Sequence, residues 1–166
     1  MNKILVCYHT KTGSTSEASG IISATLKKNG YTVDLLPLAE VTGIEQYDAV
    51  VIGAPINGMQ WVPQAVQFTE TWESALREKK TAVFCLSYIY FTGGSFWQKA
   101  IAKTLETAGS RIKAIKTGIF GGRIDSFLPA PMRFIFKIKK DAPLSIFDPK
   151  AIEKWTLSLI QSLKVQ

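Results

Sequence analysis

The feature that most constrains the fold is a regular alternation of short apolar runs with amphipathic helical patterns. Residues 3–8 and 48–53 are almost continuously apolar and have the length of strands, which is typical of parallel strands buried on both faces. Between them, residues 14–29 place their apolar side chains on one helical stripe, which Gly30 ends. Strands that alternate with helices of this length predict a parallel sheet covered by helices on both faces.

The rest of the chain continues this pattern and completes the predicted architecture. Right-handed crossovers favour a five-stranded parallel sheet of order 2-1-3-4-5 in a three-layer α/β sandwich. A chain of 166 residues without a repeat or a linker suits one domain, residues 1–166. Asp148 and Pro149 predict the cap and the first position of the final helix. The predicted strands are 3–8, 31–36, 48–53, 81–87 and 112–120, and the predicted helices are 14–29, 63–76, 97–109 and one that begins at residue 149.

Charge and cysteine content limit the classes of partner and the cellular compartment that we expect for the chain. Its formal net charge is +7, which suits nucleic acid, an anionic membrane surface or an anionic ligand. We expect no nucleic-acid partner, because no stacking platform or recognition motif accompanies the charge. Cys7 and Cys85 stand in apolar runs without metal-ligand spacing, so we expect buried thiols and a cytoplasmic protein. We expect neither a membrane-spanning helix nor a signal peptide.

Residues 121–147 do not fit the alternation and form a basic insertion before the last helix. A connection of this length inside a domain is usually functional or has structure of its own, so we predict a short helix or an extended arm at 131–140. The arm could rest peripherally on an anionic inner membrane face, or cover a quinone or a porphyrin carboxylate; the alternative is a solvated, partly packed excursion. Its cations are Arg133, Lys137, Lys139 and Lys140, and they interleave with Phe134, Ile135, Phe136 and Ile138.

The first candidate motif lies between the first strand and the first helix. A phosphate dianion needs several donors, a backbone that can approach closely and a helix N-terminus behind it. Hydroxyl groups and Gly13 meet these needs here, so we predict a phosphate cradle. The alternative is a capping box of Ser14 and Glu17 that only starts the helix. The residues of the predicted cradle are Thr10, Lys11, Thr12, Gly13, Ser14 and Thr15.

The second and third candidate motifs follow the third and fourth strands. Ligands of such a sheet bind outside the carboxyl ends of the strands where the winding reverses. Gly53 and Gly58 would let backbone lie against a flat ring, unless 57–58 is only a tight turn and Trp61 a core residue. Aromatic side chains after the fourth strand would form a wall of the slot, or else merely cover the sheet edge. The candidate ring residues are Pro55, Ile56, Asn57, Gly58, Met59, Trp61, Ser87, Tyr88, Ile89 and Gly94.

With these residues, the chain resembles the flavodoxin family. Thr10-x-Thr12-Gly13-x-Thr15 matches the phosphate loop of that family, and Gly53-x-Pro55-x-x-Gly58 resembles the second flavin loop of its quinone-reductase branches. The resemblance implies a flavodoxin-like fold and one FMN, with its phosphate on residues 10–15 and its ring between 55–61 and 87–94. The branch that looks most similar is the menaquinone-dependent protoporphyrinogen oxidases, through residues 47–53, the basic insertion and the pair Ile152 and Trp155.

The resemblance implies electron transport through bound FMN, to or from a redox partner protein, a quinone or a porphyrinogen. Two alternatives stay open: an oxidoreductase of the NAD(P)H:quinone reductase type, and a binding module that kept the fold and lost the flavin. His9 is the single histidine, and neither a nucleophile elbow nor a carboxylate pair stands out. We therefore predict no catalytic side chain and no metal site.

Overall fold

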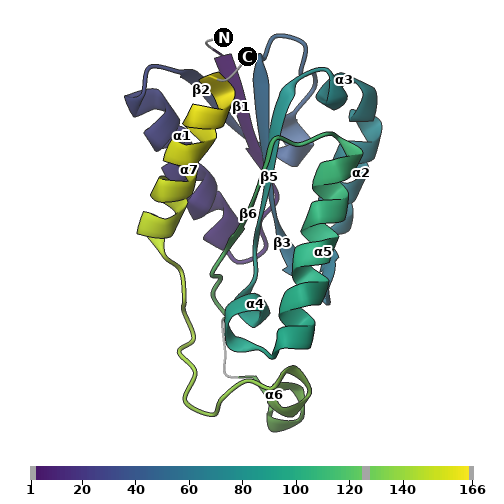
Figure 1. The fold of residues 1–166 in the computed structure, drawn as a ribbon, viewed down its shortest axis with the longest axis vertical. Coiled ribbons are helices and arrows are strands. Elements are labelled where there is room, and N and C mark those ends of the chain that lie inside the picture. The colour runs from purple at the N-terminus through teal and green to yellow at the C-terminus, as the bar shows by residue number, and fades with distance from the viewer. Residues whose placement is uncertain (1–2, 125–127, 165–166) are drawn as a thin grey trace.

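A parallel sheet runs through the centre of the molecule (Figure 1). The computed structural model describes residues 3–124 and 128–164. The strand order is β2-β1-β3-β5-β6, which confirms the predicted order, and the short strand β4 pairs antiparallel with the end of β3. The strands are β1 (Lys3–Tyr8), β2 (Thr32–Pro37), β3 (Ala49–Asn57), β4 (Gln60–Trp61), β5 (Lys80–Leu86) and β6 (Lys116–Phe120).

Helices cover both faces of the sheet (Figure 1). One face carries α1 (Ser14–Lys28) and α7 (Pro149–Lys164), and the other carries α2 (Pro63–Thr71), α3 (Glu73–Arg77) and α5 (Ser95–Arg111). The short helices are η1 (Leu38–Glu40), α4 (Tyr88–Thr92) and α6 (Ala130–Phe136). The predicted three-layer sandwich is therefore confirmed.

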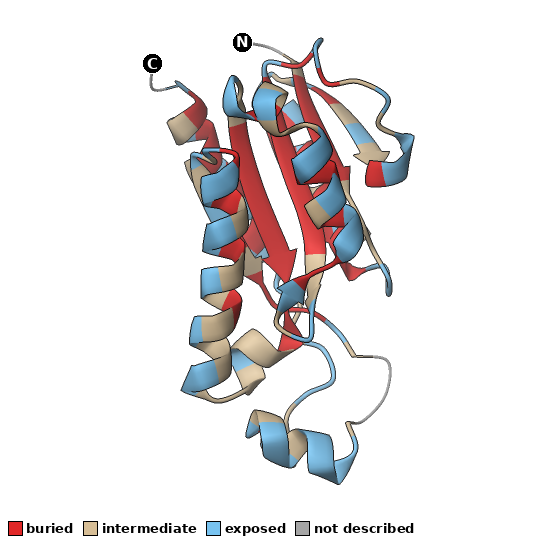
Figure 2. Cartoon of the chain, turned by 90° about the vertical axis from the view of Figure 1, so that its right-hand side faces the viewer, coloured by how far each residue is buried: buried red, intermediate tan, exposed pale blue. Residues whose placement is uncertain are grey.

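The parallel strands contribute to two hydrophobic cores because successive side chains point to opposite faces. In β1, Leu5 packs into the core beneath α2, α3 and α5, whereas Ile4 and Val6 pack into the core beneath α1 and α7. All three side chains are fully buried, and Figure 2 shows the central strands as an almost continuous buried layer. Burial on both faces explains why these strands are apolar throughout.

The final helix begins where the sequence predicts. The Oδ1 of Asp148 accepts hydrogen bonds from the backbone N–H of Lys150 at 3.0 Å and of Ala151 at 3.2 Å. A carboxylate that takes up free N–H groups in this way stabilises a helix N-terminus. Ile152 and Leu159 of this helix are fully buried against the sheet.

Three predicted segments differ from the structure. The helix predicted at 63–76 is divided at Trp72, whose φ of −104° and ψ of 14° leave the helical region between α2 and α3. The strand predicted from residue 112 is wrong at its start: α5 continues to Arg111, Ile112 ends it and is buried in the core, and Lys113 takes a positive φ of 53°. The loop predicted at 87–94 contains the helix α4.

The insertion lies beyond the carboxyl ends of the strands, at the bottom of Figure 1. The predicted helix forms as α6 and ends at Lys137, whose φ of 56° is left-handed. Most of the described insertion is exposed (Figure 2), and Ile138 is its buried apolar side chain. Residues 125–127, which belong to the predicted insertion, lie outside the described residues.

Candidate functional site

Three loops meet at the carboxyl end of the sheet because the register of the strands brings them together. Tyr8 of β1 pairs with Gly53 of β3, and Pro55 of β3 pairs with Leu86 of β5. The N–H of His9 also donates to the carbonyl of Gly53 at 2.9 Å. The loops border a cavity of about 710 Å³. The predicted residues that line it are Lys11, Thr12, Ser14, Thr15, Pro55, Ile56, Asn57, Gly58, Ser87, Tyr88 and Ile89.

The N-terminus of α1 opens toward this cavity without a side-chain cap. Gly13 is the N-cap residue, with φ 89°, and its N–H donates to Oγ1 of Thr10 at 3.0 Å. A glycine cap has no side chain that could occupy the first free N–H groups of the helix. The capping-box alternative is wrong, because Ser14 lies inside the helix and the carboxylate of Glu17 binds Arg123.

Ser14 is the one predicted cradle residue whose hydroxyl is both buried and unpaired. The residue is 4% exposed, and within the described parts of the chain its Oγ has no hydrogen-bond partner. By contrast, the buried hydroxyl of Ser19, one turn later, donates to the carbonyl of Thr15 at 2.8 Å. A buried hydroxyl without a partner costs about 1–3 kcal/mol. Together with the uncapped helix, it indicates a site for an anion with several acceptor oxygens.

The second motif forms a hairpin at the rim of the cavity. Gly58 and Met59 have φ angles of 55° and 67° and connect β3 to β4, which confirms the tight turn. Trp61 is 3% exposed and its Nε1 donates to the carbonyl of Ala54 at 3.1 Å, so this side chain belongs to the core and does not face the cavity. The carbonyl of Met59 accepts a hydrogen bond from Thr104.

Gly53 has a different role from the one predicted for it. A Cβ at this position would lie 2.0 Å from the ring of Phe84, which is fully buried beneath α1 and α7. The glycine therefore makes room for a core aromatic side chain, and backbone access for a ligand is provided farther along, at Gly58.

The third motif is more ordered than a loop. Oγ of Ser87 accepts the N–H of Tyr90 at 3.1 Å and caps α4, while the hydroxyl of Tyr88 donates to the carbonyl of Pro143 in the insertion at 2.7 Å. Gly94 does not line the cavity, and its N–H donates to the carbonyl of Phe136 at 3.0 Å. The predicted residues that do not line the cavity are thus Thr10, Gly13, Met59, Trp61 and Gly94.

Sequence analysis missed one wall of the cavity, which comes from the insertion. The unusual length and apolar content of residues 121–147 were the available signal, but nothing local indicated which side chains would turn inward. Residues at the start of α2 complete the rim. The insertion residues that line the cavity are Gly122, Arg123, Ile124, Leu128, Met132 and Phe136, and the other unpredicted ones are His9, Val62, Pro63, Gln64 and Leu86.

Burial and hydrogen bonding shift the pKa values of the two cysteine thiols and of Glu17. Burial raises the pKa of the Cys7 and Cys85 thiols, so both stay protonated and unreactive in the folded chain. The hydrogen bonds from Arg123 lower the pKa of Glu17 and keep this carboxylate ionised. Among residues 3–124 and 128–164, no group of three His, Cys, Asp or Glu side chains could hold a metal ion.

Comparison with known proteins gives a consistent result. A family model described as "Flavodoxin domain" matches residues 5–143. A short-chain flavodoxin associated with a bacterial microcompartment is 15% identical with a TM-score of 0.66, over 99% of this chain and 100% of that one. Oxidised Flavodoxin 2 from Bacillus cereus is 17% identical with a TM-score of 0.61, over 96% and 98%. A Fusobacterium nucleatum flavodoxin bound to flavin mononucleotide is 15% identical with a TM-score of 0.56, over 99% and 100%.

Proposed function

This chain belongs to the flavodoxin domain family, and on that premise we propose that residues 1–166 form one domain that binds a single FMN and transfers electrons through it. The observation that carries the proposal is the buried, unpaired hydroxyl of Ser14 at the uncapped N-terminus of α1. A phosphate monoester would supply acceptor oxygens to this hydroxyl and to the free N–H groups at once.

The residues around the cavity fit this cofactor. Thr12, Ser14 and Thr15 would hold the phosphate, and Ile56, Gly58, Tyr88 and Ile89 would border the ring, with no carboxylate lining the cavity among the described residues. When bound, FMN supplies one- and two-electron transfer, while the protein binds, orients and shields it. Lys11 adds positive charge at the cavity, which favours a bound anion.

The proposal is tested by equilibrium titration of the purified protein with FMN and with riboflavin, which lacks the phosphate. We expect FMN to bind at least 100-fold more tightly than riboflavin, because several charge-assisted hydrogen bonds of about 1.5–3 kcal/mol each depend on the phosphate. Ser14→Ala should weaken FMN binding roughly tenfold and leave riboflavin binding unchanged. Ser19→Ala is the matched control, since the hydroxyl of Ser19 is already paired within the helix. Equal affinity for the two ligands would contradict the proposal.

The electron acceptor we favour is a quinone. The cavity wall from the insertion is largely apolar, with Leu128, Met132 and Phe136 beside the loops that would border the ring. Flat apolar molecules bind such walls, whereas a porphyrinogen or a nicotinamide cofactor would need partners for its several anionic groups. A redox partner protein would serve as the electron donor.

Anaerobic reduction followed by mixing with candidate acceptors tests this choice. We expect a short-chain naphthoquinone to reoxidise the reduced, FMN-loaded protein quickly. Protoporphyrinogen and NAD(P)H, which are electron donors, should reduce the oxidised protein slowly. Met132→Asp should slow quinone reoxidation several-fold, because it places a charge on the apolar wall. Fast reduction by NAD(P)H would instead support the quinone-reductase alternative.

The insertion also has the features of a surface that rests on an anionic membrane. No helix in the described chain is long and apolar enough to cross a bilayer. Phe134 of α6 is 87% exposed and Ile135 is 57% exposed, and Lys139 and Lys140 are exposed immediately after the helix. Exposed apolar side chains flanked by lysines suit the interface of a membrane with anionic lipids. Arg133 does not share this role, because it is half-buried and Nη1 donates to the carbonyl of Lys140 at 3.2 Å.

Flotation with vesicles of anionic or neutral lipid tests the membrane contact. We expect binding to anionic vesicles only, with loss of most of it in Lys139→Glu/Lys140→Glu and in Phe134→Ser/Ile135→Ser. Lys28→Glu/Lys113→Glu is the control of equal charge change, since both lysines are exposed near the amino ends of the strands, away from the insertion. An equal effect of the control pair, or the absence of vesicle binding, would contradict the proposal.

A further inference from the structure

The two ends of the insertion, residues 121–124 and 144–147, lie side by side and form its neck. From this neck, the side chain of Arg123 reaches the first turn of α1. The guanidinium of Arg123 binds both carboxylate oxygens of Glu17, with 3.2 Å between Nη2 and Oε1. Its Nε donates to Oγ of Ser145 at 3.3 Å, and its Cζ lies 4.4 Å from the centre of the Phe147 ring. Three neighbours therefore hold this side chain in one place, and it lines the cavity at the same time.

Backbone pairing at the neck sets the position of Arg123. The N–H of Ile124 donates to the carbonyl of Leu144 at 3.0 Å, and the N–H of Ile146 donates to the carbonyl of Gly122 at 3.2 Å. Gly121 allows this close approach, because a Cβ there would lie 1.9 Å from the carbonyl oxygen of Ile146. These hydrogen bonds join the two ends of the insertion on either side of Arg123.

Glu17 makes such a cation necessary. It lies one turn after Ser14, so an unpaired carboxylate here would place negative charge one turn from the phosphate proposed to bind at the start of the same helix. Two anions one helical turn apart repel each other, and the helix N-terminus that favours each of them cannot remove that repulsion. Arg123 neutralises Glu17 through both oxygens.

We propose that Arg123 is the positioning residue that neutralises Glu17 for phosphate binding, so that FMN affinity depends on the docked insertion and bound FMN in turn stabilises its docking. This inference rests on the proposed function, because it concerns the phosphate end of the FMN site. The reciprocity follows from linkage: whatever raises FMN affinity must be favoured by FMN to the same extent.

Titration with FMN and riboflavin at low ionic strength separates the possibilities. We expect Arg123→Gln to weaken FMN binding roughly tenfold, and Glu17→Gln to bind FMN at least as tightly as the wild type. The double variant Glu17→Gln/Arg123→Gln should return to within about threefold of the wild type, because the net charge at the site is again the same. Riboflavin affinity should stay within about twofold in all three, because its binding involves no phosphate charge.

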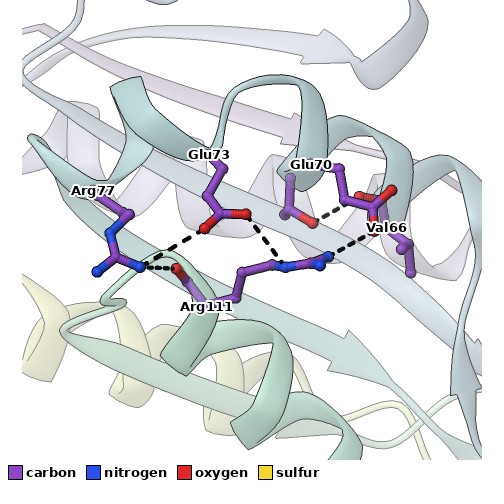
Figure 3. A network of polar contacts seen from close by, with 6 residues as sticks. Val66, Glu70, Glu73, Arg77 and Arg111 are labelled. Carbon is purple, nitrogen blue, oxygen red and sulfur yellow. Dashed lines mark hydrogen bonds and ion pairs between the residues drawn. The ribbon is translucent and has the colours of Figure 1, made fainter.

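Two further variants distinguish the effect of the Arg123 charge from the effect of the structure of the neck. Arg111→Gln is the control for the loss of an exposed, paired arginine. Figure 3 shows Arg111 beside Glu70 and Glu73, with 2.7 Å from Nη1 to Oε1 of Glu70 and 3.4 Å from Nε to Oε2 of Glu73. Their helices, α2, α3 and α5, cover the face of the sheet opposite α1 (Figure 1). We expect Arg111→Gln to leave FMN affinity unchanged. Gly121→Ala keeps every charge but disturbs the neck, and we expect it to weaken FMN binding and not riboflavin binding.

Hydrogen exchange provides a readout independent of flavin affinity. Bound FMN should slow exchange of the Ile124 and Ile146 amides in the wild type and not in Arg123→Gln. If wild-type protein binds FMN tightly but Arg123→Gln binds it equally well, or the double variant stays as weak as Arg123→Gln, this inference is overturned and the proposed function stands. If the wild type shows no preference for FMN over riboflavin, the proposed function itself fails.

Discussion

The sheet and the insertion use apolar side chains in opposite ways. The central residues of strands β1, β3 and β5 bury their apolar side chains on both faces of the sheet (Figure 2). In α6, Phe134 and Ile135 are exposed, and Ile138 is the apolar side chain of the described insertion that the fold buries. Apolar residues in the sheet thus stabilise the fold, whereas those of the insertion remain available to a ligand or a surface.

The largest effect that this comparison predicts belongs to the sheet. Gly53→Ala places a methyl group 2.0 Å from the buried ring of Phe84, and should lower the free energy of unfolding by about 3 kcal/mol. Gly58→Ala is its control in the same motif: no atom lies within 4 Å, but φ is +55°, so we expect a loss of about 1 kcal/mol. Urea unfolding of the two variants measures the difference. Equal losses would show that Phe84 can move aside.

The next largest effect on stability is expected at the start of α7, which directly follows the insertion. Asp148→Ala removes the carboxylate that accepts two N–H groups at the start of α7, and should cost about 1 kcal/mol of unfolding free energy. Asp148→Asn should restore most of it, because the amide oxygen also accepts. Thermal or urea unfolding of both variants checks this, and a variant pair of equal stability would refute the capping role.

A substitution where α5 contacts the insertion should change the global free energy of unfolding only slightly, while it loosens the insertion locally. Nε1 of Trp97 donates to the carbonyl of Ile135 at 3.1 Å, and its ring packs against Phe136 at 4.8 Å between centres. Trp97→Phe keeps an aromatic ring but removes the donor, so we expect less than about 0.5 kcal/mol of global change with faster hydrogen exchange in α6 alone. Faster exchange in β5 as well would mean that the insertion and the sheet unfold together.

The smallest predicted effect is a pH dependence. Arg123 lowers the pKa of Glu17 in the folded chain below its usual value. The pair therefore stabilises the fold above that usual value, and its contribution is lost as pH falls through the lower, folded pKa. Both side chains are more than one-third exposed, so the contribution is small and should shrink with salt. In Glu17→Gln this component of acid destabilisation should be missing, as followed by unfolding between neutral and acidic pH.

Much of the fold could be predicted because it follows from local periodicity. The run at 3–8 and the stripe in α1 each occupy consecutive residues, and the order of the strands follows from their handed connections. Boundaries were less predictable: Ile112 is as apolar as a strand residue, yet it ends α5, since burial at a helix end and burial in a strand require the same side chain.

Some residues of the candidate site could likewise be predicted from local sequence, and others could not. The proposed phosphate cradle is contiguous, so Gly13 and Ser14 could be predicted from neighbouring positions in the chain. Arg123 could not, because its partner Glu17 lies 106 positions away and an exposed arginine near a run of glycines has no distinctive pattern. Trp61 was placed in the site by proximity in sequence, but the turn at Gly58 and Met59 directs it into the core.

The sequence alone determined the layered parallel sheet and the hydroxyl-rich loop at its carboxyl end, because side-chain periodicity and a helix N-terminus act between residues close together in the chain. Only the tertiary structure decided which wall closes the cavity, which carboxylate is neutralised and which hydroxyl is left without a partner. Those depend on packing and Coulomb interactions between segments that the chain keeps far apart, and such interactions exist only once the chain has folded.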